Sequence, residues 1–178
     1  IFKGMGQTVV PELIKSLDHV DPNIRSMAAY KMGTFPHTLK KVTLKLLRLL
    51  YDPHTGVQIM TIESLQKCGL DSLPQKDVRF MLKILMRGIR SSDRWFKATS
   101  VILIGPMGRR ALPAIPMLKQ TFLSILSQRL AIYAASSLAQ IVPEGRKVLR
   151  QAVTHPNAKV RWMAFMALQR YASKGIPG

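Results

Sequence analysis

The chain has 178 residues, of which 47% are hydrophobic and 7% aromatic; this fits one folded domain and argues against wholesale disorder. The formal net charge is +18, from 27 Lys and Arg against 9 Asp and Glu, so nucleic acid, an anionic membrane or an acidic protein is the expected partner. The one cysteine, Cys68, excludes an internal disulfide framework and a cysteine-based zinc site, and favours a reducing compartment such as the cytoplasm.

Apolar runs are short and are interrupted by basic residues, as between Leu44 and Leu50. We therefore expect neither a membrane-spanning helix nor a secretory signal. The chain begins with Ile1 rather than Met, so we expect a fragment or a processed product of a longer chain.

The first predicted unit, residues 6–35, contains two helices joined by a turn at Asp21 and Pro22. Proline ends the first helix because it lacks an N–H donor, and aspartate caps the free N–H groups of the second. Ile24, Ala28 and Met32 then stand at i, i+4 and i+8, which is one stripe of a helix. The small residue at the centre of this stripe lets the two helices approach closely.

The same frame recurs four more times, with decay in the middle copies. Its anchor positions, 33, 39, 34 and 30 residues apart, are Ile24, Val57, Phe96, Leu130 and Val160. This period predicts an all-α solenoid, an α-α superhelix of about five helical hairpins, forming a single domain over residues 1–178. The predicted units are approximately 6–35, 36–70, 74–108, 111–143 and 145–173. We also expect Gly33, Gly105 and Gly145 to follow helix ends in a left-handed conformation.

Two predicted first helices carry basic residues on one face, at spacings of three and four residues. These residues are Lys41, Lys45 and Arg48 in the second unit, and Arg79, Lys83, Arg87 and Arg90 in the third. Like charges at i,i+4 repel, so folding alone gives no reason to place them together. Neighbouring first helices run side by side in a solenoid, so the two faces could merge into one partner-binding ribbon. The alternative is that long basic side chains merely keep an apolar helix in solution.

The last predicted helix places Trp162 and Met166 on a face separate from Val160, Ala164 and Leu168. Bulky apolar residues away from the core stripe indicate docking to a further repeat, another domain or a partner. Packing against the terminal hairpin is the equally simple alternative.

The repeat resembles the HEAT family, and within it the short PBS-lyase HEAT-like repeats, over about residues 6 to 173. The resemblance rests on Val10-Pro11-x-Leu13 followed by Asp21-Pro22-x-Ile24-Arg25-x-x-Ala28-Ala29-x-x-Met32-Gly33. It implies a solenoid and says little about function. It also implies that Arg25 and Arg161 are structural. In this family the arginine tends to hold the neighbouring turn acid, and Asp18 or Asp21 stands near Arg25. The middle units depart from this pattern, since Gln58, Lys97 and Ala131 stand where the arginine is expected.

The sequence offers no set of catalytic or metal-binding residues. The four histidines lie in or beside predicted turns, and no phosphate-loop, Rossmann or zinc-protease motif occurs. Two enzyme families built on similar repeats fit poorly: alkylpurine DNA glycosylases would need an aspartate where Thr99 stands, and bilin lyases would need more pocket aromatics. We therefore expect no enzyme activity, no cofactor, no metal and no small-molecule substrate.

The residues favour a non-catalytic scaffold or adaptor that binds an acidic protein partner, as a subunit of a larger complex. The alternatives are binding to nucleic acid through its phosphates, and peripheral attachment to an anionic membrane or a membrane complex. The shortage of aromatic residues for stacking disfavours nucleic acid. The expected partner-binding residues are the seven basic residues of the two helix faces, together with Trp162 and Met166.

Overall fold

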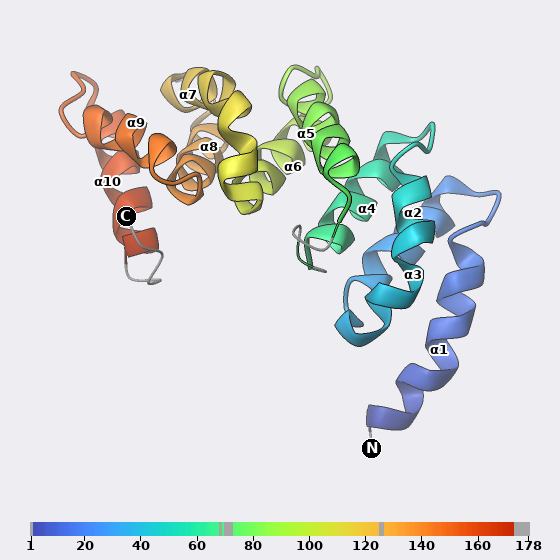
Figure 1. The fold of residues 1–178 in the computed structure, drawn as a ribbon. Coiled ribbons are helices and arrows are strands. Elements are labelled where there is room, and N and C mark those ends of the chain that lie inside the picture. Colours follow the sequence, from blue (N-terminus) through green and yellow to red (C-terminus); the bar gives the residue numbers. More distant parts are fainter. Residues whose placement is uncertain (1, 68, 70–72, 125–126, 173–178) are drawn as a thin grey trace. The chain divides into compact units, whose positions relative to one another are not determined.

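A computed structural model of the protein describes residues 2–67, 69, 73–124 and 127–172, with side chains from residue 9 onward except those of residues 36–41. Every regular element in these ranges is a helix, which confirms the predicted all-α solenoid (Figure 1). The residues group into two compact units, Ile1–Ile84 and Leu85–Gly178. A single domain with the five unit limits given above stays a prediction.

The first unit consists of two helical hairpins and most of a fifth helix. The elements are α1 (Phe2–Ser16), α2 (Pro22–Met32), α3 (Pro36–Leu49), α4 (Thr55–Lys67) and the start of α5 (Gln75–Ile89). Pro22 and Pro36 begin helices, where a missing N–H costs nothing. The Asp21 carboxylate accepts the N–H of Asn23 and so caps α2, as predicted. Helices α2 and α4 pack directly against each other.

The second unit contains the end of α5 and three further pairs of helical segments. These are α6 (Arg94–Ile104) and η2 (Gly105–Ala114), α7 (Ile115–Leu123) and α8 (Gln128–Gln140), and α9 (Glu144–Ala152) and α10 (Ala158–Ala172). Helix α8 packs against α6 on one side and α10 on the other. Asp93 and Ser127 cap α6 and α8, because their side chains accept the N–H groups of Phe96 and Leu130.

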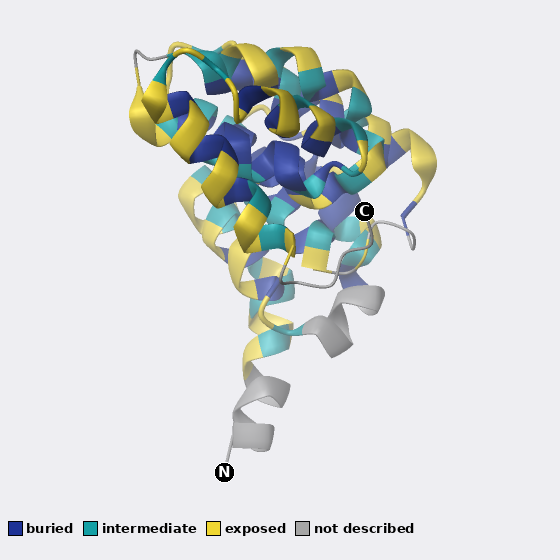
Figure 2. Ribbon diagram, turned by 90° about the vertical axis from the view of Figure 1, so that its left-hand side faces the viewer, coloured by how far each residue is buried: buried dark blue, intermediate teal, exposed yellow. Residues whose placement is uncertain are grey.

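Buried and exposed residues alternate along the helices, as an amphipathic repeat requires (Figure 2). One stretch, Arg94–Leu123, is long and apolar enough by length and composition to cross a membrane, which the sequence analysis did not expect. It is not one continuous α-helix, because Gly108 has φ 56° and ψ −135° and breaks it between α6 and α7. Many of its apolar residues, such as Val101 and Ile104, are fully buried in the core of the second unit.

The second helices of successive hairpins, such as α2 and α4 or α6 and α8, meet at contacts that we call joints. Two of these joints are built in the same way. Ser64 on α4 donates to the carbonyl of Ala29 on α2, and Ser137 on α8 donates to the carbonyl of Val101 on α6, at 2.6 Å in the second case. In both joints the serine lies seven residues after the anchor of its own helix, which is Val57 or Leu130. The carbonyl lies five residues after the anchor of the preceding second helix, which is Ile24 or Phe96. Small residues therefore let the backbones of neighbouring second helices approach closely.

The prediction that three glycines adopt a left-handed conformation is wrong. Gly33 and Gly105 have φ values of −62° and −53°, and Gly145 lies inside α9. The need for glycine is steric. A Cβ atom on Gly33 would lie 2.6 Å from the Ser64 hydroxyl, and one on Gly145 would lie 2.1 Å from the carbonyl oxygen of Leu138. Sequence spacing placed these residues near helix ends but could not show what packs against them.

Replacing Gly105 with alanine is expected to lower the free energy of unfolding by about 1–3 kcal/mol, as overpacking does. Its new Cβ would lie 2.9 Å from the Cα of Ser137, a backbone atom that cannot rotate away. Gly56 is the matched control, because nothing lies within 4 Å of its Cβ position. Alanine there should be neutral or stabilising. Thermal unfolding of both variants checks the difference, and equal losses would refute the close-approach explanation.

Arg25 joins the first two hairpins. Its Nε and one terminal nitrogen donate to the two carboxylate oxygens of Asp52 at 2.7 and 3.1 Å, and its other terminal nitrogen donates to the carbonyls of His19 and Val20. The structural role implied by the HEAT resemblance is present, but the acid is Asp52 of the following turn. The implied partners, Asp18 and Asp21, are not the acids it holds.

Burial works to raise the pKa of the Asp52 carboxyl group. Hydrogen bonds from Arg25 and from the N–H of His54, together with the charge of Arg25, outweigh burial and hold that pKa below its usual value. The ionised form of Asp52 is therefore the one that the folded protein stabilises.

Candidate functional site

The predicted basic residues of α5, namely Arg79, Lys83, Arg87 and Arg90, are all exposed. Helix α5 crosses the boundary between the two units, so the first two belong to the first unit and the last two to the second. The Arg87 guanidinium lies 5.9 Å from the ring centroid of Phe96, which gives its stem an internal contact. The other face of α5 is buried, including Met81 and Leu85. Partner binding by these four residues stays a prediction.

The predicted basic residues of α3 differ from one another. The side chain of Lys41 lies outside the described residues, and Arg48 is exposed. Lys45 is half-buried and pairs with Asp18, and its Nζ atom lies 3.4 Å from the carbonyl of Ile14. Part of the Lys45 charge is therefore used to hold α3 against the turn between α1 and α2.

The positive charge is concentrated in the second unit. Residues 85–178 contain 15 Lys and Arg but only two acids, Asp93 and Glu144, whereas residues 1–84 contain 12 and seven. The second unit is therefore the stronger attractor for an anionic partner.

A hollow of about 590 Å³ opens between α6, α7 and α8, and we call it the basic hollow. It is lined by three cations, three hydroxyl side chains and a tyrosine, among other residues: Arg94, Lys97, Ala98, Thr121, Ser124, Ser127, Arg129, Leu130 and Tyr133. No carboxylate lines it. Its cations therefore have no acidic neighbour in the hollow.

The start of two helices places these cations together. Asp93 caps α6, so Arg94 and Lys97 lie in the first turn of that helix, and Ser127 caps α8, so Arg129 lies in the first turn of the next. Helix N-termini carry partial positive charge, which adds to that of the side chains. The hollow therefore favours carboxylate or other anionic groups.

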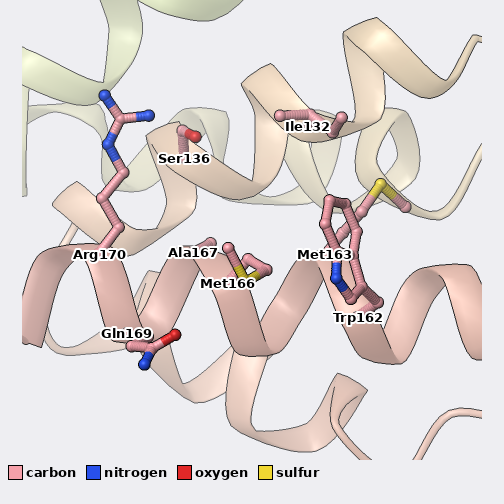
Figure 3. A pocket seen from close by; sticks show the side chains of 8 residues that line it. All are labelled: Ile132, Ser136, Trp162, Met163, Met166, Ala167, Gln169 and Arg170. Carbon is pink, nitrogen blue, oxygen red and sulfur yellow. The ribbon is translucent and has the colours of Figure 1, made fainter.

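A second hollow, of about 490 Å³, lies between α8 and α10, and we call it the apolar hollow. Figure 3 shows Ile132 and Ser136 on α8 facing the helix that carries Trp162, Met166 and Arg170. The Trp162 side chain is 53% exposed and that of Met166 is 44% exposed. The structure thus brings the two predicted apolar residues together at one concave surface.

The two hollows both border α8, and a third depression lies near the start of that helix. This smaller depression, of about 330 Å³, is lined by Gln128, Ala158, Lys159 and Trp162. Trp162 also lines the apolar hollow, and Gln128 is adjacent to Arg129 of the basic hollow. We call the three together the α8 groove. It comprises a cationic hollow and an apolar hollow that border the same helix.

The sequence analysis missed Arg94, Lys97 and Arg129. A signal was present, because all three lie within two positions of the anchors Phe96 and Leu130. Residues near the anchors begin the second helices, and successive second helices lie side by side in this unit. Spacing of i,i+4 reveals basic residues that share one helix, whereas these three residues come from two helices, α6 and α8.

Two basic residues of the last hairpin, Arg146 and Arg161, make structural hydrogen bonds. Arg146 is buried and donates to the carbonyls of Ala139 and Tyr171 at 3.0 and 3.2 Å. Arg161 donates to the carbonyls of His155 and Pro156 at 2.9 and 2.7 Å, which agrees with its predicted structural role.

Within the described ranges, no group of three or more His, Cys, Asp or Glu side chains could hold a metal ion. His19 and His155 each accept a backbone N–H through Nδ1, of Asp21 and Asn157 respectively. Both histidine rings therefore take part in the hydrogen bonds of turns.

Comparison with solved structures places the fold. A designed armadillo repeat protein in complex with the peptide (KR)4 aligns with a TM-score of 0.59 and 15% identity, over 94% of this chain and 83% of its own. The chain has the fold of a helical repeat protein. The crystal structure of an engineered protein aligns with a TM-score of 0.50 and 20% identity, over 93% and 80% of the two chains. No protein-family model and no curated protein matches the sequence.

At these identities the likeness concerns the fold alone. Human deoxyhypusine hydroxylase in complex with glycerol is more distant still, with a TM-score of 0.44 and 13% identity over 92% of this chain and 84% of its own. Within the second unit of this helical repeat protein, the α8 groove is formed mainly by three successive second helices, α6, α8 and α10.

Proposed function

We propose that the protein is a non-catalytic scaffold of HEAT type that acts in the cytoplasm and binds an acidic segment of a protein partner in the α8 groove. The observation that carries this proposal is that a cationic hollow and an apolar hollow border the same helix, α8. Carboxylates of the partner pair with Arg94, Lys97 and Arg129, and an apolar side chain of the same segment packs beside Trp162 and Met166.

The combination of charge and apolar surface favours a protein partner over the other two anions. Duplex nucleic acid presents phosphates that neutralise cations but offers no side chain to fill an apolar hollow. An anionic membrane attracts exposed cations wherever they stand, without requiring a concave surface. The designed neighbour holds a basic peptide. The α8 groove of this chain is itself positively charged and therefore favours a negatively charged partner.

The exposed basic face of α5 supports a second binding surface. Arg79 and Lys83 lie on it in the first unit, and Arg87 and Arg90 in the second. We propose that it contributes long-range attraction, because its four cations are exposed to solvent.

Titration of the protein with short peptides tests the proposed ligand. The probes are an all-glutamate peptide and the same peptide with one central leucine, with duplex DNA and phosphatidylserine vesicles in parallel. Trp162 fluorescence reports occupancy once Trp95, the second tryptophan, is replaced with phenylalanine. We expect the leucine peptide to bind most tightly, with an affinity that falls as salt rises. Equal binding of both peptides, or tighter binding of DNA or vesicles, would contradict an acidic protein partner.

A further inference from the structure

The first and last second helices begin with the same turn, built by the pattern His-x-Asx-x-x-x-Arg. In the first turn the N–H of Asp21 donates to His19 Nδ1 at 3.0 Å, and in the last the N–H of Asn157 donates to His155 Nδ1 at 3.1 Å. The two Asx side chains then accept the N–H of the residue two positions on, at 2.8 and 2.9 Å. The two turns therefore hold their arginines in equivalent positions.

Arg25 and Arg161 use the same nitrogen in the same way. One terminal nitrogen of each donates to the carbonyls six and five residues earlier, at 2.7 and 2.8 Å for Arg25 and at 2.9 and 2.7 Å for Arg161. The rest of the Arg25 guanidinium binds Asp52 of the following hairpin. Across the described ranges no carboxylate forms an ion pair with Arg161. The Arg161 guanidinium is thus held by its own turn in the same way as that of Arg25, which binds Asp52.

The acid that fits this edge is present on the first hairpin. Asp21-Pro22 repeats the sequence of Asp52-Pro53, and both aspartates accept the N–H two residues on, from Asn23 and His54. The Asp52 carboxylate also receives the arginine of the preceding hairpin. Asp21 has no such ion pair within the described part of the chain. One chain therefore carries an equivalent of Arg25 on its last hairpin, Arg161, and an equivalent of Asp52 on its first hairpin, Asp21.

We propose that copies of this chain associate head to tail, with Arg161 on the α9–α10 hairpin of one copy bound to Asp21 on the α1–α2 hairpin of the next. Phe165, 57% exposed, stands at the α10 position equivalent to Ala29, which touches the following hairpin in the first unit. Helix α2 exposes Met27, which supplies apolar area for the same joint. Two different surfaces meet in such a contact, so it forms open chains of copies rather than closed dimers.

Charge makes the first hairpin the most favourable acceptor. Residues 2–35 carry four basic and three acidic side chains, which is nearly neutral. Residues 144–172 carry six basic residues and one acid, so docking against a nearly neutral surface costs little repulsion. Salt screens the remaining long-range repulsion between copies and should strengthen the association, whereas it weakens binding of an acidic peptide.

Sedimentation equilibrium of the full 178-residue chain tests the proposal. We expect the weight-average mass to rise continuously with concentration, without a plateau at the dimer. Asp21→Asn should weaken each association step about tenfold or more, because it removes the carboxylate from a charge-assisted pair. The fold should survive, because Asn157 makes the same cap in the equivalent turn.

A mixture of two blocked variants provides the sharper test. Asp21→Arg removes the acidic half and Arg161→Ala removes the basic half without supplying a charge that the introduced arginine could bind, so each variant alone should be monomeric. Mixed, they retain one intact joint and should form dimers that grow no further. Lys97→Glu with Arg129→Glu, in the α8 groove, should not weaken assembly, because it leaves the joint intact and lowers the repulsion between copies, and so it separates this contact from the proposed function. A wild-type chain that stays monomeric, a closed dimer, or association unaffected by Asp21→Asn would overturn the proposal.

Discussion

Replacing Asp52 with alanine is expected to lower the free energy of unfolding by about 3 kcal/mol, as removal of one partner from a buried ion pair does. The carboxylate and the Arg25 guanidinium are 6% and 13% exposed, so water replaces little of the lost contact. The variant also loses the cap on the N–H of His54. Thermal or denaturant unfolding measures the loss.

Asp21→Ala is the matched control, because Asp21 caps a backbone N–H in the same way but pairs with no arginine in the described chain. It should cost about 1 kcal/mol, the usual effect of a lost cap. The excess loss in Asp52→Ala then belongs to the Arg25 contact. Equal losses would show that Asp52 acts only as a cap.

The same contact predicts an acid-dependent stability. Because the pKa of Asp52 is lower in the folded chain than in the unfolded one, its stabilisation is fully present above the unfolded value, about 3.9. The stabilisation is lost as the pH falls through the lower, folded value. The melting temperatures of the wild type and Asp52→Ala should therefore converge in acid, and a constant difference would contradict the ionised pair.

Reversing Lys97 and Arg129 together to glutamate is expected to weaken binding of the acidic leucine peptide by about 100-fold or more. Two charge-assisted contacts are lost, each of about 1.5–3 kcal/mol, and two repulsive charges are added to a hollow with no other carboxylate. Both side chains lie in first turns near the surface, so the melting temperature should change little. Peptide titration and thermal unfolding measure the two effects.

Two other double reversals serve as controls, because they change the net charge equally. Lys147→Glu with Arg150→Glu alters two exposed residues of α9 outside the groove and should weaken binding only a few-fold, through long-range attraction. Lys83→Glu with Arg87→Glu tests the predicted α5 face and should leave helicity and melting temperature nearly unchanged. If this pair weakens binding more than the groove pair, α5 is the binding surface and the groove is not.

The sequence by itself determined the helical hairpins. The anchors, the turn at Asp21-Pro22 and the stripe of Ile24, Ala28 and Met32 depend on residues within a few positions of one another, and local backbone physics decides their structure. The exposure of Trp162 and Met166 followed from the same helical spacing. Fold class could therefore be read from neighbours along the chain.

Only the tertiary structure decided which distant residues meet. Asp52 lies 27 positions from Arg25, and no spacing rule distinguished it from Asp18 or Asp21. The α8 groove likewise gathers Arg94, Arg129 and Trp162 from three helices. The physical reason is that hydrogen bonds and charge pairs depend on distances of a few ångströms in space. Those distances are set by helix packing, which the small residues at the joints permit.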